Sequence, residues 1–434
     1  MHRGDVFMQF RDLPGLIRKS ETISRIGKIE NVEGMLLEAS GGRTSIGEIY
    51  MIYDERENRH IPAEVIGFKQ NKIQMMSYED TNGISSGSIV RSTKKRLKIP
   101  VGNFLKGRVI DAMGRPIFGE RFSDSQFCYV ENTYTNPLKR PPITERLDFG
   151  VKAIDGLLTI GKGQRIGIFA GSGVGKSTLL GMIAKNSTAD INVIALVGER
   201  GREVREFIER DLGEEGRQRS VVVVATSDES SMMRMKCPLV ATTIAEYFRN
   251  QGKDVLLMMD SLTRFAMAKR EIGLSLGEPP VARGYTPSIY TEFPKLLERS
   301  GRFKEGSITG VYTVLVEGDD TNEPIADTVR GILDGHIVLT RKLANENHFP
   351  AIDINASISR LMSSVASERQ KELASGIRDI LSTYSKNEDL ISIGAYKMGT
   401  SQKVDQAISR IDRVNAFLMQ GVNESFTHDE VVSE

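Results

Sequence analysis

A glycine-rich turn between an apolar run and a helix-forming stretch is the feature that most constrains this fold. The turn, Ala170-Gly171-Ser172-Gly173-Val174-Gly175-Lys176-Ser177-Thr178, follows Ile166–Phe169 and precedes Leu179–Ile183. Glycines let the backbone curl so that consecutive N–H groups point at one anion, and a helix start adds partial positive charge there. The order strand, turn and helix is the context that a phosphate-binding P-loop requires.

The end of this turn has the chemistry of a nucleotide site. Lys176 is expected to reach the β- and γ-phosphates, and the Ser177 hydroxyl is expected to hold Mg²⁺. Ala170 stands where the motif has glycine, but alanine is also small, and a chance glycine turn is the alternative. The residues predicted to bind the nucleotide are Gly171, Ser172, Gly173, Val174, Gly175, Lys176, Ser177 and Thr178.

Composition narrows the class of protein. The 434 residues allow two or three domains, and 39% hydrophobic content is enough for a normal core. Because 58 Lys and Arg balance 57 Asp and Glu, no strong overall charge attracts nucleic acid. No apolar run approaches the roughly 18 residues of a membrane span, and no signal peptide begins the chain. The two cysteines and five scattered histidines suggest no metal site beyond Mg²⁺. We expect a cytoplasmic protein.

The first part of the chain predicts an arm and a small domain. Residues 1–22 are amphipathic and basic, which suits docking to a partner or to a membrane surface, or a frayed terminus. Residues 23–95 contain short apolar runs between turn signals, which predicts a small β-barrel. The basic Lys94–Lys98 stretch is interpreted as a solvated exit segment, with a nucleic-acid or lipid contact as the alternative.

The rest of the chain predicts an α/β domain and a helical tail. After a Gly/Pro-rich connection at 100–150, apolar strands alternate with helices, so 96–360 is expected to form a P-loop domain with a mostly parallel sheet and helices on both faces. Helical periodicity in 361–434 predicts a C-terminal helical domain. The strand candidates are Arg165–Phe169, Asn192–Val197, Val221–Ala225, Val255–Met259, Val311–Val316 and His336–Leu339.

Two carboxylates that follow predicted strands are candidates to act on the nucleotide bound at the P-loop. Asp260 ends an apolar strand in the form of a Walker B element, where it would orient Mg²⁺. Alone it would be a capping or turn residue, but a P-loop upstream favours the metal role. Glu199 follows another buried strand at the same sheet edge, where it could orient the water that attacks the γ-phosphate. Its alternative is a salt bridge to Arg200 or Arg202.

Several longer strings together resemble the rotary ATPase family, which includes ATP synthase catalytic subunits and type III export ATPases. The match runs from about residue 24 to the last helices, and within the family the strings Met258–Ala268, Arg283–Pro287 and Asn322–His336 are most similar to the flagellum-specific export ATPase. The strings are Ala170–Thr178, Gly198–Glu206, Asp260-Ser261-Leu262-Thr263-Arg264-Phe265-Ala266-Met267-Ala268, Arg283–Pro287, Asn322–His336 and Pro350-Ala351-Ile352-Asp353.

The resemblance implies residue roles. Lys176 and Ser177 would take the phosphate and Mg²⁺ positions of an ATP site, and Glu199 the catalytic carboxylate, with Arg200 beside it. Phe349 would stack on the adenine ring. Arg360 matches an arginine finger that enters the neighbouring subunit's site. On residues alone, Arg360 reads as an ordinary surface arginine.

The resemblance also implies an assembly and partners. One sequence carries both Glu199 and Arg360, which predicts a homo-oligomeric ring, most simply a hexamer. Gly277–Pro287 and Glu317–Asp320 resemble parts that face a central channel and a stalk protein, although both could be solvated loops. The expected setting is the cytoplasmic face of the export gate, with peripheral membrane association only, chaperone–cargo complexes as further partners and an accessory export regulator at residues 1–22.

Three alternatives remain at this point. The nearest is the ATPase of a virulence type III secretion system, with the same chemistry and different partners. The second is an ATP synthase catalytic subunit, against which the tail offers no strongly acidic rotor-contacting run. The third is a ring-shaped RNA translocase, which the near-zero net charge and the lack of aromatic and basic platforms in residues 24–90 disfavour.

Overall fold

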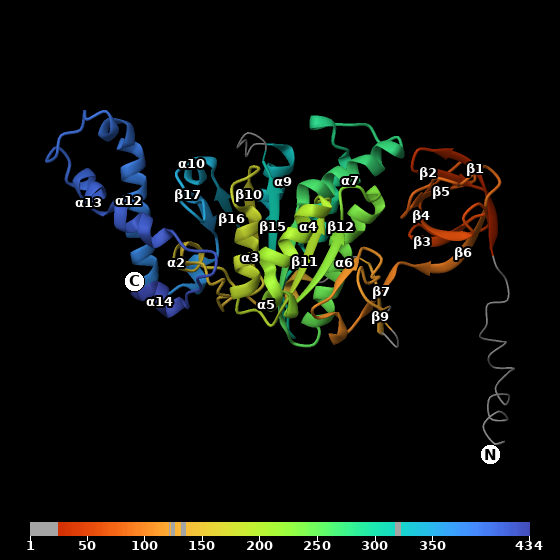
Figure 1. Ribbon diagram of the computed structural model, residues 1–434, viewed down its shortest axis with the longest axis horizontal. Coiled ribbons are helices and arrows are strands. Elements are labelled where there is room, and N and C mark those ends of the chain that lie inside the picture. The colour runs from red at the N-terminus through yellow and green to blue at the C-terminus, as the bar shows by residue number, and fades with distance from the viewer. Residues whose placement is uncertain (1–24, 121, 123–125, 132–135, 317–322) are drawn as a thin grey trace, which may run out of the picture. The chain divides into compact units, whose positions relative to one another are not determined.

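The computed structural model describes residues 25–120, 122, 126–131, 136–316 and 323–434 (Figure 1). The predicted arm at residues 1–22 and the acidic segment Glu317–Asp320 lie outside these ranges. The described chain divides into two compact units between Leu97 and Lys98. No helix in the described residues has the length and apolar character needed to cross a membrane.

The first unit is a closed antiparallel barrel, as the sequence predicted. Its strands follow one another around the barrel in the order β1-β2-β5-β4-β3-β6, and β1 pairs with β6 to close it. Alternate side chains fill the interior, among them Leu37, Ile52 and Val65. The strands are β1 Ile26–Glu33, β2 Leu36–Ala39, β3 Glu48–Asp54, β4 Arg59–Lys69, β5 Lys72–Ser77 and β6 Ile89–Arg96.

The interpretation of Lys94–Lys98 as an exit segment was wrong for most of its length. Residues 94–96 end β6, where Arg96 lies opposite Glu48 of β3. Lys98 begins β7 of the second unit. The β6 residues that close the barrel against β1 are 89–91, and the extension to Arg96 instead pairs with β3, so cross-strand pairing overrides the preference of basic residues for loops.

The second unit is built on a mostly parallel sheet in the order β17-β16-β10-β15-β13-β11-β12-β8. Only β17 on β16 and the short β14 on β15 pair antiparallel in it. Strand β11 is buried along its whole length, which is why it reads as a continuous apolar run. The strands are β8 Val109–Asp111, β10 Arg165–Ala170, β11 Ile191–Val197, β12 Ser220–Ala225, β13 Asp254–Asp260, β14 Gly301–Arg302, β15 Ser307–Leu315, β16 Gly335–Leu339 and β17 Ile352–Ser359.

The stretch interpreted as a connection, 100–150, contributes more than a linker. Its strand β8 pairs parallel with β12 at the sheet edge. Strands β7 Lys98–Val101 and β9 Gln126–Tyr129 form a separate two-stranded ribbon. These strands are three or four residues long, too short for a period-2 pattern to stand out among the surrounding glycines and prolines.

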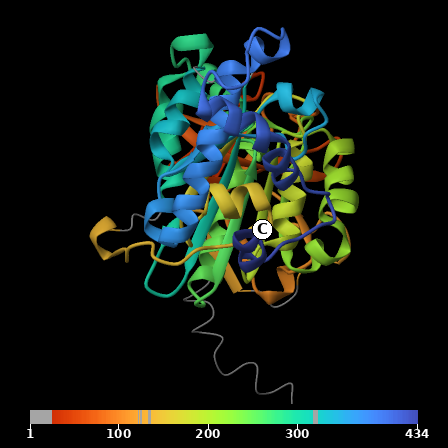
Figure 2. The same ribbon diagram turned by 90° about the vertical axis from the view of Figure 1, so that its left-hand side faces the viewer.

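Helices lie on both sides of this sheet, with α3 and α5 (yellow-green) to one side and α9 (teal) to the other (Figure 2). A π-helical turn at Phe207–Leu212 joins α4 and α5. The helices of the sheet domain are α2 Lys152–Leu157, α3 Lys176–Asn186, α4 Gly201–Glu206, α5 Gly213–Gln218, α6 Ser231–Arg249, α7 Leu262–Ser275, α8 Pro287–Leu297, α9 Pro324–Ile332 and α10 Arg341–Asn345.

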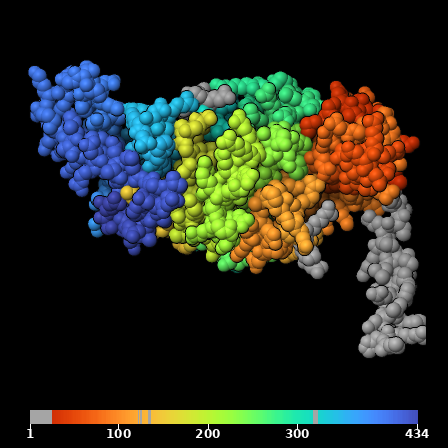
Figure 3. Space-filling model, in the orientation of Figure 1, coloured from red at the N-terminus to blue at the C-terminus, as the bar shows by residue number. Residues whose placement is uncertain are grey.

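The tail is helical, as its periodicity predicted. Helices α12 and α13 pack side by side, and α2 lies against α12, α13 and α14. The blue surface of the tail adjoins the light-blue surface of the last part of the sheet domain (Figure 3). The tail helices are α11 Met362–Val365, α12 Glu368–Ser392, α13 Gln402–Leu418 and α14 His428–Ser433.

Candidate active site

The glycine-rich turn connects the carboxyl end of β10 to α3. Ala170 is the last residue of the strand, and Lys176 is the first residue of the helix. Gly175 caps the helix with a φ of 89°, a left-handed conformation that glycine adopts without strain, and no side chain caps the first N–H groups. The helix therefore presents uncapped N–H donors, which are the groups that bind a phosphate.

Lys176 meets both predicted carboxylates at this edge of the sheet. Its Nζ donates a short hydrogen bond to Oδ1 of Asp260 at the end of β13. It also lies 3.7 Å from Oε1 of Glu199, which follows β11. Strands β11 and β13 are direct parallel neighbours, so residues just past their ends lie side by side. The structure thus brings Lys176, Glu199 and Asp260 together.

Glu199 is held in an environment that disfavours its charge. Burial, followed by repulsion from Asp260, raises the pKa of the Glu199 carboxyl to about 7, although Lys176 and Arg264 pull it down. Oε1 of Glu199 has no hydrogen-bond partner within the described residues. A carboxyl group that titrates near neutral pH is suited to accept a proton from water.

Arg264 is a site residue to which the sequence assigned no role. Its Nη1 donates to the Gly198 carbonyl at 2.7 Å, and its Nη2 lies 3.4 Å from Oε2 of Glu199. A Cβ on Gly198 would come within 3.0 Å of the Arg264 side chain, so glycine is needed for this approach. Arg264 was part of a quoted string, but nothing in that string shows that it turns back to Glu199.

The residues around Lys176 fit a Mg²⁺-bound nucleotide. The hydroxyl of Ser177 and the carboxylate of Asp260 are hard oxygen donors of the kind that Mg²⁺ prefers, and they are the residues that would hold it. Thr313 of β15 donates its hydroxyl to Oδ1 of Asp260 at 2.7 Å, which fixes that carboxylate. The buried Oε1 of Glu199 accepts no hydrogen bond from the described residues, although Nε of Arg264 and Nζ of Lys176 lie 3.4 Å and 3.7 Å from it, so it can still accept one from a bound water.

Phe349 lies beside the P-loop in a pocket of about 610 Å³. Its ring would be 3.6 Å from a Cβ built on Gly175, and its side chain is 40% exposed. The opposite wall is the segment Met419–Glu424 just after α13, which the sequence did not predict. The segment is tied down by the Gln420 N–H, which donates to the Phe349 carbonyl at 3.0 Å.

Replacing Phe349 with alanine is expected to weaken ATP binding without a comparable loss of maximal rate. An aromatic contact adds about 0.5–1.5 kcal/mol beyond area burial, which corresponds to roughly 2- to 12-fold in Kd. Titration with a fluorescent ATP analogue would measure this change. Phe349→Tyr is the matched control and should bind normally. An unchanged Kd for the alanine variant would remove Phe349 from the base pocket.

Arg200 and Arg360 lie away from this cluster. Arg200 precedes α4, and its 77% exposed side chain pairs with Glu203 at 3.3 Å. The suggested salt bridge from Glu199 to Arg200 or Arg202 is not formed, because Arg202 pairs with Glu206. Arg360 is exposed and follows β17, whose antiparallel course ends opposite Gly335, at the start of β16.

The strand register shows that Arg360 cannot reach its own P-loop. Ala170, where the loop starts, is level with Leu339, the end of β16. Arg360 follows Ser359, which is level with Gly335 at the other end of that strand. Four residues of strand separate the two levels by about 13 Å. The arginine and the P-loop of one chain therefore lie at opposite edges of the sheet.

Sequence comparisons identify the three parts of the chain. The ATP synthase alpha/beta family nucleotide-binding domain matches residues 150–359, and the beta-barrel domain of that family matches 29–94. The T3SS EscN ATPase C-terminal domain matches 366–434.

Similar proteins extend over almost the whole chain. The chain is 53% identical to the flagellum-specific ATP synthase of Bacillus subtilis, over 98% of each chain. It is 45% identical to the type 3 secretion system ATPase of Xanthomonas euvesicatoria, over 94% of this chain and 92% of that one. Its structure resembles the assembled ATPase EscN of enteropathogenic E. coli, with a TM-score of 0.89, 45% identity and coverage of 94% and 98%. The chain belongs to the ATP synthase alpha/beta family, in the branch of the flagellum-specific and type III secretion ATPases.

Proposed function

We propose that this chain hydrolyses ATP to energise flagellar type III protein export. The observation that carries the hydrolytic part is the position of the P-loop Lys176 against two strand-terminal carboxylates, Asp260 and Glu199. The flagellar part rests on relatives: the flagellum-specific proteins of Bacillus subtilis and Treponema pallidum are 53% and 49% identical to this chain.

The chain's own residues divide the chemistry of hydrolysis between them. Lys176 and the N–H groups at the start of α3 bind the β- and γ-phosphates. Glu199, whose carboxyl pKa is raised to about 7, orients the attacking water and accepts its proton. Ser177 and Asp260 would hold Mg²⁺, which when bound neutralises charge on the phosphate oxygens. Phe349 contacts the adenine.

Arg360 completes the site of a neighbouring copy. Its guanidinium is exposed, and no hydrogen bond or ion pair engages it within the described part of the chain. Because it lies at the sheet edge opposite its own P-loop, it can act on ATP only in another subunit. Each pocket in a homo-oligomeric ring, most simply a hexamer, would then take Glu199 from one copy and Arg360 from the next. Arg200, which follows Glu199 in the sequence and has an exposed side chain, is proposed to lie at the same interface.

The relatives support a proposal for the setting in which the chain works. EscN has been solved assembled and in complex with its central stalk EscO, so a stalk protein is the expected partner inside a ring of this chain. The exposed turn in Gly277–Pro287 is the described segment proposed to face it. We place the ring at the cytoplasmic face of the export gate, peripheral to the membrane, where it would receive chaperone–cargo complexes; residues 1–22 would bind the accessory regulator.

A virulence secretion ATPase is the second candidate, because a solved ATPase from the type III secretion system of pathogenic bacteria is 50% identical to this chain over 78% of its length. Deleting the gene would distinguish the two candidates. Cells that no longer build flagellar filaments support the flagellar proposal. Cells that stay motile but no longer inject proteins support the virulence secretion ATPase. The match of residues 366–434 to a type III C-terminal domain favours either of these over an ATP synthase subunit.

Specific ATPase activity is expected to rise steeply with protein concentration. Since no chain can supply Arg360 to its own P-loop, an isolated subunit lacks a group worth about 10³–10⁵ in rate. Steady-state phosphate release measured across the range in which light scattering shows assembly tests this expectation. A specific activity that stays constant down to the monomeric range would contradict the shared site.

A further inference from the structure

The backbone that carries Arg360 is fixed by buried hydrogen bonds from the preceding residue. The Ser359 hydroxyl donates to the Thr159 carbonyl at 2.9 Å. It accepts from Nε2 of Gln164 at 3.0 Å. The Arg360 N–H itself donates to the Asp334 carbonyl at 3.0 Å, and Nε2 of Gln164 approaches the same oxygen at 3.3 Å. The start of the Arg360 side chain is therefore held from two sides.

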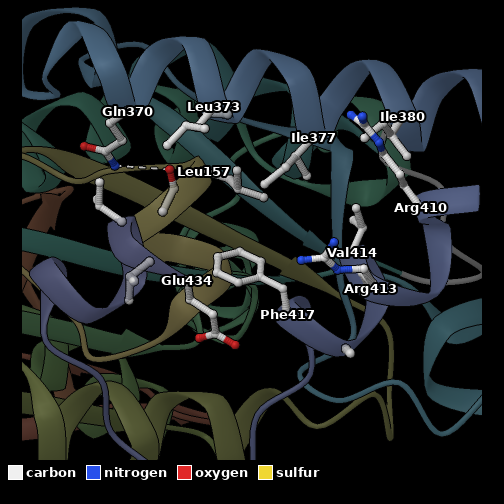
Figure 4. A pocket seen from close by; sticks show the side chains of 15 residues that line it. Leu157, Gln370, Leu373, Ile377, Ile380, Arg410, Arg413, Val414, Phe417 and Glu434 are labelled. Atoms are coloured by element: carbon white, nitrogen blue, oxygen red, sulfur yellow. Dashed lines mark hydrogen bonds between the residues drawn. The ribbon is translucent and has the colours of Figure 1, made fainter. Parts of the chain in front are cut away.

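These bonds continue to the first turn of α12. Nε2 of Gln370 donates to the Thr159 hydroxyl at 2.8 Å and to the carbonyls of Asp155 at 2.8 Å and Gly156 at 3.1 Å. Figure 4 shows the Gln370 amide turned toward the segment that bears Leu157, at one end of a pocket between α2, α12 and α13. The side-chain amide of Gln370, in the helical tail, is therefore hydrogen-bonded to the segment 155–159, and the Ser359 hydroxyl is bonded to the same segment.

The polar side chains that make up this hydrogen-bond network are all buried. The four polar side chains are between 0% and 9% exposed, and they are Gln164, Thr159, Gln370 and Ser359. Oε1 of Gln370 is buried with no partner in the described residues. Replacing the amide with an apolar group would take this donor from the Asp155 and Gly156 carbonyls and from the Thr159 hydroxyl, and a buried acceptor left unpaired costs about 1–3 kcal/mol.

We propose that Gln370 is a positioning residue for Arg360 and acts through Thr159 and Ser359. The side chain of Arg360 makes no hydrogen bond or ion pair with the described residues, so within its own chain only the position of its backbone, from which the side chain starts, is fixed. The network fixes that backbone relative to α12, and through it the helical tail sets how well the arginine fits the neighbour's site. This inference rests on the proposed action of Arg360 in a second subunit.

Mixed rings can locate the effect of Gln370→Met, which keeps the side chain's length and removes its amide. Glu199→Gln subunits serve as arginine donors, and Arg360→Ala subunits serve as site owners; only a donor beside an owner forms a complete site. We expect Gln370→Met in the donor to lower the recovered ATPase rate by roughly 10- to 100-fold, the scale of a misplacement near 1 Å. The same substitution in the owner should leave recovery unchanged.

Each other result of the mixed-ring experiment would contradict the positioning role of Gln370. Equal loss in both arms, loss in the owner alone, or no loss in either arm overturns it, because the residue would not act through the donated arginine. No recovery from donors and owners without Gln370→Met, in rings shown to form, overturns the shared site itself.

A matched pair of threonines gives an independent control. Thr159 and Thr242 are both buried and both donate to the carbonyl four residues earlier, but only Thr159 also accepts from Gln370. Thr159→Val in the donor should reduce recovery as Gln370→Met does, and Thr242→Val should not. Equal effects of the two threonine variants would show general destabilisation and would contradict the positioning role.

Discussion

Replacing Glu199 with glutamine is expected to lower the rate of ATP hydrolysis by roughly 10²–10⁴-fold, the usual contribution of a positioned general base. Glutamine keeps the shape of the side chain but cannot accept a proton from water. ATP should still bind, because Lys176 and the α3 N-terminus are untouched, and the neutral amide removes a negative charge from beside the triphosphate. Single-turnover phosphate release and nucleotide affinity, measured on the same assembled sample, separate the two effects.

The pH profile of the unmodified protein gives a second measure of the same group. Only the ionised carboxylate is a base, so kcat/KM should rise with pH through a midpoint near 7. The stability effect has the opposite sign. Because the folded pKa lies above the ordinary value of 4.5, this group's contribution to the free energy of unfolding falls between about pH 4.5 and 7 and is constant above.

Glu199→Gln removes that stability loss, so the variant should unfold no more easily than the parent at pH 8. This comparison shows whether an inactive sample is merely unfolded. Near-normal phosphate release by the glutamine variant, or a kcat/KM that stays flat from pH 5.5 to 8, would show that another group activates the water.

The fold was predictable where one local pattern dominates. The P-loop turn and buried strands such as β11 carry their signal in a few consecutive residues. The short edge strand β8 was not predictable, since its pairing with β12 depends on residues more than 100 positions away. The β6 extension through Arg96 likewise depends on a distant strand, since Arg96 pairs with Glu48 of β3.

The candidate site was predictable in its residue types but not in its contacts. The sequence placed Asp260 and Glu199 at strand ends, and the parallel register brings them to Lys176. It could not show that Arg264 turns back onto Glu199, because a side-chain direction is set by tertiary packing. It also gave Arg360 no role on residues alone, and the antiparallel course of β17 now argues that the arginine serves another chain.

Replacing Arg360 with alanine is expected to reduce the rate of assembled rings by about 10³–10⁵-fold, since the guanidinium would stabilise the charge that develops on the transferred phosphate. The lost group belongs to one copy and the affected site to the next, so the defect should be complemented in trans. In rings assembled from equal amounts of Arg360→Ala and Glu199→Gln subunits, about one interface in four has both groups intact, and the rate should recover toward that fraction. Phosphate release is compared with that of each variant alone, and Lys176→Ala in place of Glu199→Gln tests whether a subunit can still donate its arginine when its own P-loop is inactive. A mixture that forms rings yet is no faster than its components would contradict an arginine donated between subunits.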